Sequence, residues 1–118
     1  MLTIRSHQIE ALGRDLEVRF EQRLAQLLMQ LYEDAARQGA AGVRQAVHAA
    51  VARARAYGLR TEAELATYAN AAWLLGEEFD TRFPAAPLVL SRRGLAPADK
   101  VEWLAAWTTA LFEELQAG

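Results

Sequence analysis

Tyr-Gly-Leu-Arg-Thr-Glu-Ala-Glu at residues 57–64 is the sharpest local signal in this chain. Gly58 can adopt the backbone conformation that commonly closes a helix, so it marks a helix end. Thr61 and Glu64 stand at capping-box spacing: the threonine hydroxyl accepts from the amide of the third helical residue, and the glutamate reaches back to the cap residue's own N–H. These residues therefore predict two helices joined by a short turn.

The helix that ends at Gly58 has an apolar face of small side chains, which allows a neighbouring helix to approach closely. Upstream of it, residues 38–42 contain two glycines in five positions, which weaken a helix and supply C-cap conformations. We therefore expect one helix to end in this segment and a second to begin near Val43. The small apolar face comprises Val43, Val47, Val51 and Ala54.

The longest periodic segment precedes these glycines, with Ser6 as its predicted N-cap and an unbroken run to about Ala36. At 1.5 Å per residue such a helix would span about 46 Å, whereas a compact domain of this size is about 35 Å across. The helix therefore either breaks early or extends past the domain. If it extends, one expectation is a homodimer in which the long helices of two chains pair. The predicted stripe comprises Ile9, Leu12, Leu16, Phe20, Leu24, Leu27 and Leu31.

Downstream of residue 64 the same periodicity predicts further helices. One helix carries Leu65 and ends at Gly76, and a last helix begins at Pro97, where the missing N–H costs nothing. Residues 87–90 are predicted to be a short helix, because a lone strand would have no partner. The fold class is thus all-α: a four-helix bundle-like single domain over 1–118, with a short extra helix between the last two main helices. The expected seam of the last helix is Val101, Leu104, Thr108, Leu111 and Leu115.

Composition sets the class of protein. The chain has 118 residues, 53% of them hydrophobic and 24% charged, which is typical of one globular domain. A formal net charge of −2 gives no overall attraction to nucleic acid or to an anionic membrane, and no segment approaches the roughly 20 apolar residues of a membrane span. The absence of cysteine excludes disulfides and thiolate chemistry. We expect a cytoplasmic protein.

No group of residues has the spacing of a catalytic or cofactor site. His7 and His48 are the two histidines, whereas a metal site needs three or four ligands. The sequence has neither a nucleophile motif of the G-x-S-x-G type nor a glycine-rich phosphate loop. We therefore predict a protein that is not an enzyme and needs no cofactor.

Arginines gather in the second predicted helix and the turn after it, with no acidic residue among them. One interpretation is a binding surface for an acidic protein partner or, more weakly, for nucleic acid. The other is structural: Arg53 and Arg55 complement the helix dipole and meet acids of the first helix. The arginines are Arg44, Arg53, Arg55 and Arg60.

Four aromatic residues are the remaining candidates for binding a partner: Tyr57, Phe83, Trp103 and Trp107. The two tryptophans are four residues apart and so stack along one side of the last helix. Exposed aromatics often form the energetic centre of a protein interface. The alternative is that residues 79–90 cover them.

Four groups of motifs lie along most of the chain: Ile4-Arg5-Ser6-His7-Gln8 with Leu12, Phe20 with Arg23, Arg-Ala-Arg-Ala-Tyr-Gly-Leu at 53–59 followed by Glu62, and Leu74-Leu75-Gly76 with Phe79-Asp80. Together they resemble a family of small helical bacterial proteins associated with genes for type VI secretion effectors and their VgrG and PAAR carriers. The resemblance implies an accessory or chaperone-like protein that binds an effector, its adaptor or its carrier before export. A nucleic-acid-binding regulator using the basic second helix and an immunity protein are the alternatives.

Overall fold

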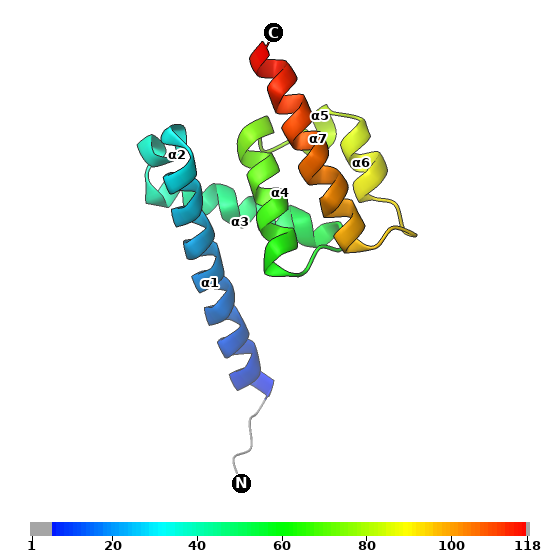
Figure 1. Cartoon of the computed structure of the whole chain (residues 1–118). Helices are drawn as coiled ribbons and strands as arrows, with labels where there is room; N and C mark the ends of the chain where they lie inside the picture. Colours follow the sequence, from blue (N-terminus) through cyan, green and yellow to red (C-terminus); the bar gives the residue numbers. More distant parts are fainter. Residues whose placement is uncertain (1–5, 118) are drawn as a thin grey trace. The chain divides into compact units, whose positions relative to one another are not determined.

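The computed structural model describes the backbone of residues 6–117 and the side chains of residues 16–117. Over this range the chain forms helices and turns without a strand, which confirms the all-α prediction (Figure 1). The helices are α1 (Ser6–Leu31), α2 (Glu33–Gln38), α3 (Ala40–Ala56), α4 (Glu62–Leu75), α5 (Phe79–Arg82), α6 (Ala85–Leu90) and α7 (Pro97–Ala117).

The chain divides into two compact units between Arg44 and Gln45, so that α3 begins in the first unit and continues in the second. The prediction of a single domain over 1–118 stays a prediction.

In the first unit, the prediction of an unbroken helix to about Ala36 is wrong. Tyr32 adopts an extended conformation, with φ of −128° and ψ of 125°, and separates α1 from α2. Neither glycine nor proline marks this break. The sequence signal for a new helix here is Glu33-Asp34, because acidic residues are favoured in the first turn of a helix. Gly39, with φ of 91°, then ends α2 as expected, and α3 begins at Ala40, three residues before the predicted start.

The predicted stripe of α1 is only partly buried. Phe20 and Leu24 are buried, whereas Leu16, Leu27 and Leu31 are 45–59% exposed. Leu28, which the stripe omits, is buried instead, and it lies about 100° around the helix from Leu27. The apolar arc of α1 is therefore wider than the part of it that is covered. The side chains of Ser6, Ile9 and Leu12 lie outside the described residues.

The second unit is built on α4 and α7, which pack side by side (Figure 1). The turn at residues 57–64 is confirmed: Gly58 has φ of 89°, and the Thr61–Glu64 capping box is formed in both directions. Gly76, with φ of 108°, ends α4 as predicted. The core of this unit includes Val47, Val51, Ala54, Leu59, Leu65, Tyr68, Leu75, Phe79, Leu90 and Leu104.

Between α4 and α7 the single short helix of the prediction is present as α6, and α5 precedes it. In α7, Pro97 is the first helical residue as predicted, and Leu104 and Thr108 are buried. The seam is nevertheless shorter than predicted, because Leu115 is 56% exposed. Lys100 takes a buried place near the start of the helix that the leucine pattern did not assign.

Candidate functional site

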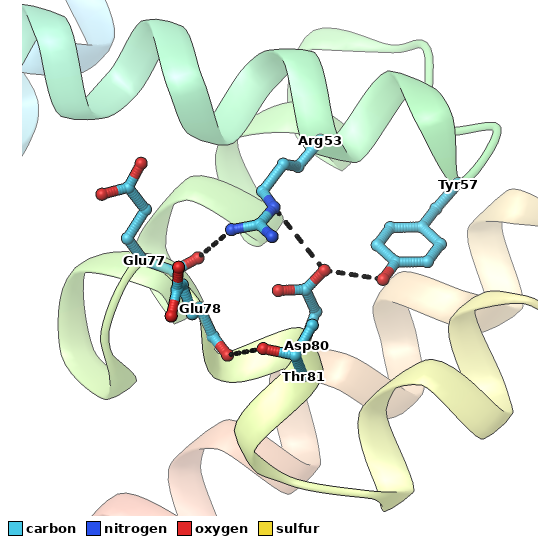
Figure 2. Close-up of polar contacts among 6 residues, drawn as sticks. All are labelled: Arg53, Tyr57, Glu77, Glu78, Asp80 and Thr81. Atoms are coloured by element: carbon cyan, nitrogen blue, oxygen red, sulfur yellow. Dashed lines mark hydrogen bonds and ion pairs between the residues drawn. The ribbon is translucent and has the colours of Figure 1, made fainter.

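The buried carboxylate of Asp80 is the centre of a polar network in the second unit (Figure 2). Arg53 and Tyr57 are four residues apart on α3 and its following turn, so both side chains point to the same side of the helix. The Tyr57 hydroxyl donates to Asp80 Oδ2 at 2.7 Å, and Arg53 Nε lies 3.7 Å from the same oxygen. The Asp80 side chain is only 5% exposed, so its charge needs compensation, and these two groups supply it at Oδ2.

Burial and the Asp80 charge also fix the protonation of two tyrosines. Burial, followed by the hydrogen bond to Asp80, raises the pKa of Tyr57 to about 12. Burial, followed by repulsion from the Asp80 charge, raises the pKa of the Tyr68 hydroxyl still further above its usual range. Both hydroxyls therefore stay protonated further into alkaline solution than an ordinary tyrosine does, and that of Tyr57 donates to Asp80.

The same network anchors the turn between α4 and α5. An Arg53 guanidinium nitrogen donates to the backbone oxygen of Glu77 at 3.1 Å, and the Thr81 hydroxyl donates to the backbone oxygen of Glu78 at 3.0 Å (Figure 2). On the other side, Lys100 Nζ donates to the backbone oxygen of Tyr57 at 2.9 Å. The end of α3 is thereby tied both to α5 and to the start of α7.

A column of aromatic rings runs from this network through the core to α7. The centroids of Tyr57 and Tyr68 are 6.0 Å apart, those of Tyr68 and Phe79 are 5.0 Å apart, and those of Phe79 and Trp107 are 6.3 Å apart. Tyr68 and Phe79 are fully buried, so they form the rigid middle of the column. Aromatic pairs at these separations stabilise one another beyond the area that they bury.

At its far end the column reaches a partly exposed group of three rings, Phe83, Trp103 and Trp107, which we call the aromatic face. Trp103 and Trp107 stack with centroids 5.1 Å apart and an interplanar angle of 14°, as their spacing predicted. Phe83 meets Trp107 edge-on at 5.7 Å. The guanidinium of Arg82 lies 6.0 Å from the Phe83 centroid, within cation–π range.

The structure thus links five of the seven residues predicted to bind a partner, through ring contacts and through Asp80: Arg53, Tyr57, Phe83, Trp103 and Trp107. The other two, Arg44 and Arg55, are exposed residues of α3. The acid that Arg53 meets is Asp80, which corrects the expectation of an acid from the first helix.

Sequence reasoning did not single out Asp80 as a site residue. The signal available for it was an acidic residue directly after Phe79 in an otherwise aromatic and proline-rich segment. For the four candidate aromatics neither alternative holds alone, because other rings contact each of them and yet all four stay partly exposed.

The described residues contain no group of three or more metal-ligating side chains, and no helix within that range is both long and apolar enough to cross a membrane. Asp80 Oδ1 and the Tyr68 hydroxyl are buried, and neither has a hydrogen-bond partner among the described residues. The arrangement is suited to holding α3, α5 and α7 in fixed positions.

No family model, curated protein or solved structure matches this chain.

Proposed function

We propose that this protein is a non-catalytic accessory factor that binds another protein, as a chaperone or adaptor for a type VI secretion effector in the bacterial cytoplasm. The observation that carries the proposal is the aromatic face: two stacked tryptophans and an edge-on phenylalanine, all partly exposed. Tryptophan is the residue most enriched among those that dominate binding energies. Partly exposed aromatic rings therefore mark the surface best suited to a protein partner.

The support beneath this face makes it suitable for binding. Immobilising a flexible side chain on association costs about 0.5–1.5 kcal/mol. Trp107 is already held between Phe79, Phe83 and Trp103, and so loses little freedom when a partner covers it. The chain therefore offers a preorganised apolar surface.

The resemblance to proteins associated with type VI secretion supports the choice of partner. Three residues from its motifs, Arg53, Tyr57 and Asp80, form the network beneath the aromatic column. On this proposal the motifs serve to hold the binding surface in shape. The partner is then an effector, its adaptor or its carrier.

Affinity capture from native cells tests the proposal. The tagged chain should recover a secretion effector, adaptor or carrier at moderate salt, and Trp103→Ala should reduce the recovery. Leu115→Ala is the matched control, because Leu115 is a large exposed side chain eight residues beyond Trp107 on the same helix. Capture of no such protein by the wild-type chain would contradict the proposal.

Two other results of the same experiment would support the alternatives. Rescue of cells from the captured effector would indicate an immunity protein. Recovery that is lost after nuclease treatment would indicate a nucleic-acid-binding regulator.

A homodimer through α1 stays a prediction, supported by the exposure of Leu16, Leu27 and Leu31. Sedimentation velocity over a range of concentrations tests it. A mass that stays monomeric, or a dimer unaffected by Leu27→Ser, would contradict it.

A further inference from the structure

Helix α6 leaves one side open. The opposite side of α6 packs into the core through Ala86 and Leu90, which are both fully buried. The open side, together with Thr81 from α5, forms a shallow surface groove of about 820 Å³, which we call the α6 groove. Leu88 on this side is 70% exposed, more than any other large hydrophobic side chain in the described part of the chain. The groove is lined by Thr81, Pro84, Pro87, Leu88, Ser91 and Arg92.

The lining is well suited to an apolar contact because four of its members, Pro84, Pro87, Leu88 and Ser91, recur at the three- and four-residue spacing of one helical side. Proline has almost no side-chain freedom to lose when it is covered, so the two prolines lower the cost of ordering this surface. A segment with an apolar stripe would therefore bind here without rearranging α6.

Charge defines the other requirement of the occupant. Arg92 lines the groove two residues after Leu90, where α6 ends, and Arg93 follows it. Both side chains are exposed, and neither has a hydrogen bond or ion pair to any described residue, in contrast to Arg53, which is held by Asp80. Arginine binds carboxylates through paired N–H groups, so an acidic group is the complement that this end of the groove offers to recognise.

From this apolar lining and its unpaired arginine we infer that the α6 groove binds an amphipathic, acidic helical segment of a partner protein. Apolar side chains of the segment cover Leu88 and the two prolines, and a carboxylate pairs with Arg92. The inference goes beyond the proposed function, because none of the three rings of the aromatic face lines the α6 groove. Apolar contact would supply affinity, and the ion pair would set the orientation of the segment.

The test uses a labelled 20-residue helical peptide with leucine at positions i, i+3, i+4 and i+7 of its repeat and glutamate on its flanks. The same peptide with lysine in place of glutamate is the control. Fluorescence anisotropy should show the glutamate peptide binding about tenfold more tightly than the lysine peptide, a difference of about 1.4 kcal/mol. R92E should abolish or reverse this preference, and L88S should weaken binding of both peptides. R60E, which changes an exposed arginine in the turn before α4, should leave the preference intact.

Leu88 and Arg92 are exposed, so both variants should fold as the wild type does, and circular dichroism of each variant checks this. Absence of binding, equal affinity for the two peptides, or a preference that survives R92E would overturn the inference. Self-association of the chain that R92E abolishes would overturn it as well, because the occupant would then be a second copy. None of these results bears on effector capture through Trp103, so the proposed function is tested separately.

Discussion

Tyr57, which is partly exposed, and Tyr68, which is fully buried, together provide a sharp test of the buried network. The hydroxyl of Tyr57 donates to Asp80 Oδ2 at 2.7 Å, whereas the hydroxyl of Tyr68 is buried with no partner among the described residues. Replacing either tyrosine with phenylalanine removes the same atom. We expect Tyr57→Phe to destabilise the protein and Tyr68→Phe to be neutral or stabilising.

The magnitudes follow from the environments. A hydrogen bond to a charged group contributes about 1.5–3 kcal/mol, and partial exposure of Tyr57 lets water replace some of it, so the expected loss is about 1–2 kcal/mol. With an unfolding entropy of about 0.25 kcal/mol/K for a chain of this length, Tm falls by about 4–8 °C. Losing the unpaired hydroxyl of Tyr68 should gain up to about 1 kcal/mol.

Urea denaturation followed by circular dichroism measures both free energies of unfolding. In an Asp80→Asn background the cost of Tyr57→Phe should shrink, because the charge that the hydroxyl contacts is gone. If Tyr57→Phe and Tyr68→Phe change stability equally, or if the cost of Tyr57→Phe is the same in both backgrounds, the Tyr57–Asp80 contact does not stabilise the end of α3.

Three further predictions concern pH and local backbone structure. The pKa of Tyr57 is raised to about 12 in the folded chain, against about 10 in the unfolded chain. The contribution of Tyr57 to stability is therefore complete below pH 10 and is lost as pH rises toward 12. Urea titrations at several pH values should show that Tyr57→Phe flattens this decline. Gly58→Ala should cost about 1 kcal/mol in the same assay, because φ there is +89° while an added Cβ would meet no atom within 4 Å. Gly94→Ala, with equally open space and no positive φ, should change stability by less than half as much, and equal costs would refute the backbone explanation. Thr61→Ala should cost about 1 kcal/mol through loss of the capping box, and a neutral result would contradict that role.

Local signals predicted the helix ends of the second unit well. Gly58, Thr61 and Gly76 act through backbone conformation or through hydrogen bonds to near neighbours, so residues three or four positions away are enough to define them. Tyr32 shows the opposite case. Its extended conformation ends α1 directly after Leu31, the last leucine of the stripe, and neither a glycine nor a proline marks that position.

The sequence predicted most residues of the candidate site but not the contacts between residues far apart in the chain. Trp103 and Trp107 stack because they are four apart on one helix, which the sequence shows directly. The contact of Tyr57 with Asp80 joins residues 23 positions apart, and no helical spacing relates them. The extent of burial also depends on tertiary packing, so the exposure of Leu16 and Leu115 could not be read from periodicity.

If the aromatic face binds the protein partner, isothermal titration calorimetry with the captured effector, adaptor or carrier should show the loss of a single tryptophan. Removing a tryptophan at the centre of an interface costs about 2 kcal/mol or more, so Trp103→Ala should bind at least roughly 30-fold more weakly than the wild-type chain. Leu115→Ala should bind as the wild type does. Equal affinity of the wild-type and Trp103→Ala proteins would contradict the claim.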